Sequence, residues 1–297
     1  NTYALLIDQF AANSANPGAY YCNAIEFRNS LMELGWSKSS FSYLFGNDEI
    51  TQTNLKAKMD DLEQKVDSND VVIVFFAAHG YGCLRDILDL NSWFHEEFLE
   101  IPTDYKILLI DACHAGEFIE PLAAFVENET FFAMGSVAAT EFAIAFTYDD
   151  STNWNYSEPQ FYGIISSHFW SQALTNQSAD ENLDSHVSLT EMYDFSFPII
   201  RTIYSEVFLN DPEITEFVDT NTGYHDNYPN PEVISNLDGN FSLDNEYLQT
   251  HIEQLMVVTP GEKLAIILGS VGTVVILTAT ITVVVLRGKK KKQLKTN

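Results

Sequence analysis

Basic residues are scarce in this chain, whereas acidic residues are plentiful. Its 297 residues include 15 Lys and Arg against 42 Asp and Glu, which gives a formal net charge of −27. A protein with this balance repels the phosphates of nucleic acids, so nucleic acid is excluded as a partner. The chain also has no low-complexity stretch before its end and is 46% hydrophobic, which excludes a wholly disordered protein.

Cysteine is equally sparse. The chain has three cysteines, which are too few for a fold held together by disulfides. Cys22 and Cys83 could form a bridge that leaves Cys113 free, but the sequence alone does not decide this. The histidines lack the spacing of zinc ligands, so neither a zinc site nor any other cofactor is predicted.

Charge is absent from residues 264–286, which read LAIILGSVGTVVILTATITVVVL. As a helix this segment is about 34 Å long, enough to cross the hydrocarbon core of a bilayer. The lysine-rich residues 287–297 follow it and indicate a cytoplasmic end by the positive-inside rule. We therefore expect a single-pass type I membrane protein, with a juxtamembrane linker at 244–263 and a body outside the cytoplasm, at the cell surface or in a lumen. The chain begins with Asn1, as a mature protein does after removal of a signal peptide.

The body alternates between apolar runs and helical patterns. Strands are predicted at 2–10, 41–45, 70–78, 105–110 and 130–137, and helices at 19–35, 51–66, 161–174 and 188–207. Pro198 is expected to kink or divide the last helix, and residues 210–231 to be irregular surface structure. Strands that are apolar on both faces and alternate with helices indicate an α/β fold with a mostly parallel sheet covered by helices on each side.

Reactive residues follow two of the predicted strands. His79 and Gly80 come directly after 70–78, and Cys113 follows 105–110. Since catalytic groups gather at the carboxyl ends of parallel strands, a base and a nucleophile would lie side by side if these strands are neighbours. His79 would take the thiol proton and later protonate the leaving amine. The backbone N–H groups of Gly80 and Cys113 would form an oxyanion hole.

The segments VVIVFFAAHGYG and ILLIDACHAGEF resemble the His-Gly and Asp-Ala-Cys-His-Ser-Gly blocks of the caspase and metacaspase superfamily of cysteine peptidases, in peptidase clan CD. Further blocks follow in order, namely GIISSHFWSQAL, SLTEMYDF and YPNPEVISNLDGNFSL. The resemblance covers about residues 2–243. It implies a caspase-like α/β/α sandwich over residues 1–243 and a cysteine endopeptidase that acts on proteins or peptides through a dyad of His79 and Cys113.

Asp111 occupies the position at which metacaspases have an acidic residue that accepts Arg or Lys ahead of the scissile bond. Caspases have Gln there and prefer Asp. Alternatively, Asp111 only satisfies backbone groups of its loop. A second acidic pocket residue of metacaspases is missing here, because the matching residues are Cys22, Asn23 and Ala24. Asp111 is the predicted substrate-binding residue.

Two alternative functions remain open. A legumain-like or GPI-transamidase-like enzyme of the same clan fits the predicted topology, and a non-catalytic, membrane-tethered interaction module would use the same scaffold.

Calcium activates some metacaspases, and acidic pairs such as Asp48–Glu49 and Asp180–Glu181 could bind it, although such pairs are common on solvated surfaces. No Lys or Arg lies between Lys106 and Arg201, so an enzyme selective for basic residues could not cut itself there.

Overall fold

The computed structural model describes residues 1–11, 22–88, 93–143, 145–148, 161–203, 205 and 229–257. The chain divides into two compact units, Asn1–Tyr247 and Leu248–Asn297. Among the described residues, the strands and the candidate site belong to the first unit. The helix α9 (Asn245–Val257) lies within residues 244–263, the predicted linker, and extends into the second unit.

A six-stranded sheet forms the centre of the first unit. Its strand order is β2-β1-β3-β4-β5-β8, with bounds β1 (Thr2–Asp8), β2 (Phe41–Phe45), β3 (Val71–Ala77), β4 (Tyr105–Asp111), β5 (Phe131–Gly135) and β8 (Glu232–Ser235). The first five pair in parallel, and β8 pairs antiparallel with β5 at the edge. The predicted mostly parallel sheet is therefore confirmed, and the antiparallel edge strand β8 was not foreseen.

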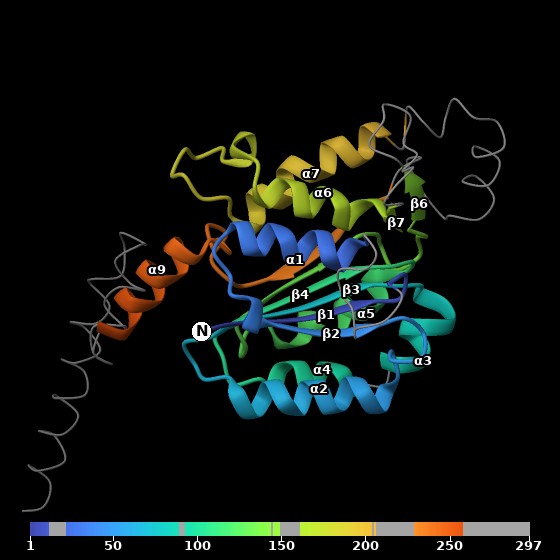
Figure 1. Cartoon of the computed structure of the whole chain (residues 1–297), viewed down its shortest axis with the longest axis horizontal. Helices are drawn as coiled ribbons and strands as arrows, with labels where there is room; N and C mark the ends of the chain where they lie inside the picture. Colours follow the sequence, from blue (N-terminus) through green and yellow to red (C-terminus); the bar gives the residue numbers. More distant parts are fainter. Residues whose placement is uncertain are drawn as a thin grey trace, which may run out of the picture. The chain divides into compact units, whose positions relative to one another are not determined.

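Helices cover both faces of this sheet (Figure 1). The helices α1 (Asn23–Glu33), α6 (Ile165–Leu174) and α7 (Leu189–Ile203) lie on one face, and α2 (Gln52–Lys65) and α4 (Trp93–Glu100) lie on the other. Short helices follow the two central strands, namely α3 (Arg85–Leu88) and α5 (Ala115–Ile119). This is the three-layer arrangement that the alternation of strands and helices predicts.

The central strands are buried because every side chain on them has a helix layer to pack against. All residues of β3 and β4 are buried. On one face, Phe75 stacks on Phe27 of α1, with ring centroids 4.8 Å apart. On the other, Phe76 meets Phe94 of α4 edge to face at 5.5 Å. Alternate residues of one strand thus anchor the two opposite helix layers.

One helix prediction needs correction. Residues 161–164 are not helical but form β7 (Phe161–Ile164), which pairs with β6 (Ala145–Tyr148) in a separate two-stranded sheet. Pro198 lies inside α7, which is continuous from Leu189 to Ile203, so it does not divide the helix. The alternative, a kink at Pro198, stays a prediction. Most of the irregular segment predicted at 210–231 lies outside the described residues.

Residues 264–286, the predicted membrane span, also lie outside the described residues. Within the described ranges, no helix has the length and apolar character needed to cross a membrane.

Candidate active site

Cys113 follows β4 and is half-buried. Its Sγ donates a hydrogen bond to the carbonyl oxygen of Ala143 at 3.4 Å. Burial raises the pKa of the Cys113 thiol, while hydrogen bonds with the backbone of Ala143 and Gly80 lower it in part. The thiol is therefore partly shielded from solvent and lies against the backbone of Gly80 and Ala143.

His79 follows β3 and is exposed. Its backbone N–H donates to Oε1 of Gln9 at 2.8 Å. Its ring meets Phe10 edge to face, with centroids 5.2 Å apart. Two residues just after β1, Gln9 and Phe10, thus contact the backbone and the ring of His79.

The register of the sheet brings these two loops together. Ala77 pairs with Asp111, and the N–H of Ala78 donates to the carbonyl oxygen of Asp111 at 3.1 Å. His79 and Cys113 each come two residues after that pair, on neighbouring strands. A β-carbon on Gly80 would lie 1.9 Å from the carbonyl oxygen of Cys113, so the two loops touch through their backbones.

The residue after the thiol has an uncommon backbone conformation. His114 lies in the left-handed region with φ 58° and ψ 31°, which residues other than glycine rarely adopt. Its backbone N–H donates to the carbonyl oxygen of Glu141 at 2.7 Å, and its Nδ1 is 2.7 Å from the carbonyl oxygen of Ala139. Its ring packs edge to face against Tyr81 and Phe142, with centroids 4.4 and 4.5 Å away.

Asp111 is fully buried at the end of β4. Its Oδ2 accepts the N–H of Ser167 in the first turn of α6 at 2.6 Å, whereas its Oδ1 has no hydrogen-bond partner among the described residues. Burial raises the pKa of Asp111 to about 6, although the hydrogen bond from Ser167 acts in the opposite direction. The carboxylate thus binds a backbone N–H of α6 through one oxygen and has no partner among the described residues at the other. Its role in substrate binding stays a prediction.

The match to known proteins agrees with this arrangement. A model of the caspase domain matches residues 2–195, which is more than half of the chain. The chain belongs to the caspase-domain family. This caspase domain supports a function of the cysteine-peptidase type, with proteins or peptides as substrates. A comparison with curated proteins gave no match.

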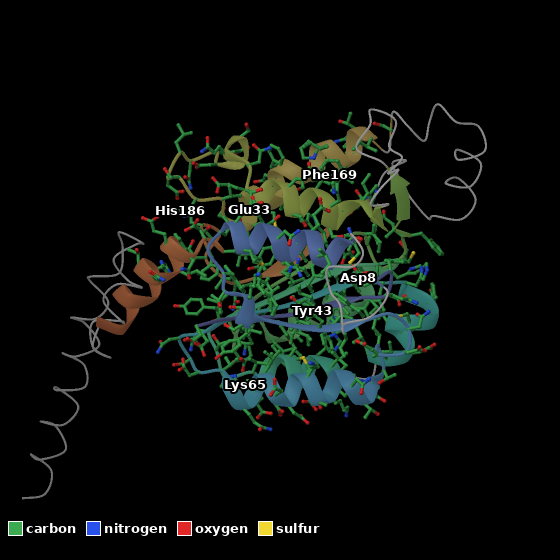
Figure 2. All side chains as sticks on the ribbon, viewed as in Figure 1. Asp8, Glu33, Tyr43, Lys65, Phe169 and His186 are labelled. Carbon is green, nitrogen blue, oxygen red and sulfur yellow. The ribbon has the colours of Figure 1, made fainter. Side chains whose placement is uncertain are left out.

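A second buried carboxylate of this caspase domain, Asp8, was not predicted from the sequence. Asp8, labelled in Figure 2, ends β1 and is fully buried. It pairs with Ala77, which pairs in turn with Asp111, so the two carboxylates lie in one row on one face of the sheet. Burial raises the pKa of Asp8 to about 6, and hydrogen bonds from the N–H groups of Ala24 and Phe10 oppose this shift. The position of Asp8 at the end of an apolar run could have indicated it. Its place beside Asp111 depends on the register of β1, β3 and β4, which the sequence does not give.

The cysteines outside the candidate site are free thiols. Cys22 and Cys83 are buried and unbridged, so the suggested disulfide between them is absent. Burial raises the pKa of the Cys83 thiol to about 11 and raises that of Cys22 as well. Neither has the half-open setting of Cys113, and the structure gives no reason to regard either as a nucleophile.

The two acidic pairs considered for calcium have different surroundings. In the pair Asp48–Glu49, the side chain of Glu49 accepts the N–H of Phe45 at 3.1 Å. Asp180 begins a segment in which oxygen-bearing residues recur at the positions 1, 3, 5, 9 and 12 that calcium loops use, namely Asp180, Asn182, Asp184, Ser188 and Glu191. His186 of the same loop is labelled in Figure 2.

In this loop, backbone groups bind the carboxylates. Asp180 accepts the N–H groups of Asp184 and Ser185, and Glu191 accepts those of Glu181, Asn182 and Ser188. Across the part of the chain that the structure describes, no group of three or more His, Cys, Asp or Glu side chains is arranged to hold a metal ion. Calcium therefore stays a prediction.

Proposed function

We propose that this protein is a cysteine endopeptidase that uses Cys113 as nucleophile and His79 as general base and acid. The observation that most directly supports this proposal is the pairing of Ala77 with Asp111 in neighbouring parallel strands. Because His79 and Cys113 each come two residues after this pair, both lie at the carboxyl ends of these strands. The contact between Gly80 and the backbone of Cys113 brings the two loops together at this edge.

In the proposed reaction, His79 accepts the thiol proton as Sγ of Cys113 attacks the carbonyl carbon of the scissile peptide bond. The N–H groups of Gly80 and Cys113 stabilise the negative oxygen of the tetrahedral intermediate. The C–N bond then breaks, and His79 gives its proton to the leaving amine. A water molecule, deprotonated by His79, hydrolyses the acyl-enzyme and regenerates the thiol.

Specificity for Arg or Lys ahead of the scissile bond is part of the proposal. The buried Oδ1 of Asp111, which has no hydrogen-bond partner among the described residues, is the group available to a cationic side chain. Asp8 adds a second buried carboxylate in the same row. Bringing a guanidinium or ammonium group to this edge would compensate two buried negative charges, which favours basic residues over Asp.

Membrane attachment through residues 264–286 is also proposed, from the uncharged run and the lysine-rich residues that follow it. It would make the protein single-pass, with its caspase domain outside the cytoplasm. Alkaline carbonate extraction of membranes tests this: the full chain should stay in the pellet and a chain ending at 263 should not. Protease digestion of sealed cells or vesicles would then show on which side the caspase domain lies.

The enzymatic proposal is tested on the full chain in detergent, with fluorogenic peptides ending in Arg, Lys, Asp or Asn, beside Cys113→Ala. We expect cleavage after Arg or Lys that is absent in the variant. Cleavage after Asn or Asp would retain the dyad but favour a legumain-like or caspase-like specificity. If amines rather than water accept the acyl group, a transamidase is favoured. A Cys113 that remains inert to every peptide and to peptidyl electrophiles would favour a non-catalytic module.

A further inference from the structure

One buried carboxylate, that of Glu141, organises the loop that holds the turn after the nucleophile. The carbonyl oxygen of Glu141 accepts the N–H of His114, the residue next to Cys113. The N–H of Ala138 donates to Oε2 of Glu141 at 3.0 Å, which closes the loop on itself. Because the left-handed turn at His114 is intrinsically unfavourable, it persists only where surrounding contacts hold it.

The partners of the Glu141 carboxylate come largely from a distant part of the chain. Glu141 is 1% exposed, and a carboxylate buried to this extent requires hydrogen-bond donors. Asn230 supplies two of them: its backbone N–H reaches Oε2 and its side-chain Nδ2 reaches Oε1, both at 2.7 Å. Asn230 thus binds both oxygens of the carboxylate, which fixes its position and orientation.

The strand that follows Asn230 packs against the same turn. A β-carbon on Gly116 would lie 2.4 Å from the backbone nitrogen of Ala139 and 2.8 Å from Oε2 of Glu232, the first residue of β8. The N–H of Gly116 donates to the carbonyl oxygen of Val137 at 3.0 Å. The start of α5, the loop 137–141 and the residues 230–232 are therefore closely packed around the nucleophile turn.

We propose that Asn230 and Glu141 are positioning residues that hold the turn of Cys113 and His114 in its catalytic geometry. The inference rests on the proposed role of Cys113 as nucleophile. It extends the functional part of the chain beyond residue 195, where the match to the caspase domain ends. Residues 230–232 then act on catalysis through Glu141 and His114 without touching the substrate.

Asn236 provides a matched control at the other end of β8. Its Oδ1 accepts the N–H of Phe131 at 3.0 Å, and its Nδ2 donates to the carbonyl oxygens of Val126 and Glu129, both at 2.6 Å. Like Asn230, it is an asparagine that joins the β8 region to the rest of the domain through several amide hydrogen bonds. Its bonds, however, are to the amino end of β5 and not to the nucleophile turn.

The test compares Asn230→Ala, Asn230→Asp and Asn236→Ala in the full chain. Asn230→Asp keeps the size and the backbone N–H but replaces the side-chain donor with a carboxylate that repels Glu141. Three quantities are measured: kcat and KM on a peptide that the wild type cleaves, the rate at which iodoacetamide alkylates Cys113 by peptide mass mapping, and the temperature of thermal unfolding. The alkylation rate measures the exposure and reactivity of the Cys113 thiol, whether or not any peptide is cleaved.

We expect both Asn230 variants to lower kcat about tenfold or more with KM nearly unchanged, since small displacements of a reacting group have effects of this size. Alkylation of Cys113 should become faster as the turn loosens. Asn236→Ala should lower the unfolding temperature but leave kcat and alkylation as in the wild type. The proposal is overturned if the Asn230 and Asn236 variants change alkylation equally, or if Asn230→Asp matches the wild type in both readouts. A wild type without peptidase activity would count against the proposed function alone, and the alkylation rates would still decide the positioning role.

Discussion

Gly80 and Cys113 meet backbone to backbone. A β-carbon on Gly80 would lie 1.9 Å from the carbonyl oxygen of Cys113 and 3.2 Å from its β-carbon. The loop after β3 and the loop after β4 therefore come closer than any residue with a side chain would allow. This approach places the N–H of Gly80 beside the thiol, where its hydrogen bond lowers the pKa of Cys113.

Gly80→Ala should therefore abolish turnover without unfolding the domain. The added methyl group has to push the nucleophile loop away, and rates fall steeply with such displacements, by about a hundredfold for 1 Å. The measurement is kcat on the best peptide substrate. Gly239→Ala is the matched control, because its β-carbon would lie an ordinary 3.4 Å from Oγ1 of Thr190. Equal activity of the two variants would contradict the close contact.

Asp111→Asn should raise KM for peptides ending in Arg or Lys and leave kcat less affected, because the variant loses the proposed charge partner of the substrate. In the wild type the same KM should rise as the pH falls below about 6, where Asp111 becomes protonated. The variant should lack this acid dependence. The measurement is KM from pH 5 to 8 for the wild type and for Asp111→Asn. If KM depends on pH in the same way in both proteins, Asp111 does not bind the substrate.

The same substitution has a predicted effect on stability. The pKa of Asp111 is raised from 3.8 to about 6, so between these values the folded state holds more protons than the unfolded state. The free energy of unfolding attributable to this group therefore falls as the pH rises from about 4 to about 6, by about 1–3 kcal/mol in all. Asp111→Asn should reduce this slope in denaturant titrations at several pH values. An unchanged slope would show that the pKa of Asp111 is not raised in the folded state.

Calcium binding, if it occurs, should depend on the loop that begins at Asp180. Glu191 is in the twelfth position, and its carboxylate would have to exchange its backbone N–H donors for the ion. Isothermal titration of the full chain with calcium should give a signal that Glu191→Gln and Asp180→Asn remove and that Asp48→Asn does not. Chelation should then lower the unfolding temperature of the wild type only. A signal that persists in Glu191→Gln would place calcium elsewhere.

The purified enzyme should remain uncut between Lys106 and Arg201. No Lys or Arg occurs between these residues, so a peptidase specific for basic residues has no site there on its own chain. Intact-mass spectrometry after prolonged incubation at high concentration is the measurement. Fragments that end at an Asp or Asn of residues 147–160 and are absent in Cys113→Ala would contradict the proposed Arg/Lys specificity.

Local sequence patterns were sufficient for the main elements of the sheet. The residues of β3 are all apolar, as are most of β4, because both faces of these strands are covered, and such runs are readable without knowing any contact. His79 and Cys113 could be singled out because each follows one of these runs. The strand at 161–164 was not predicted, since its residues continue directly into α6 and periodicity does not separate four extended residues from a following helix.

The alternation of apolar strands and amphipathic helices, the acidic charge and the two reactive residues after strands can all be read from the amino-acid sequence. These properties depend on residues that are close together along the chain. Other features are visible only in the folded chain: β3 and β4 are neighbours, Asp8 shares a row with Asp111, Cys22 and Cys83 are unbridged, and Asn230 binds Glu141. Each of these depends on strand order, register or packing between distant segments, which single-chain periodicity does not encode.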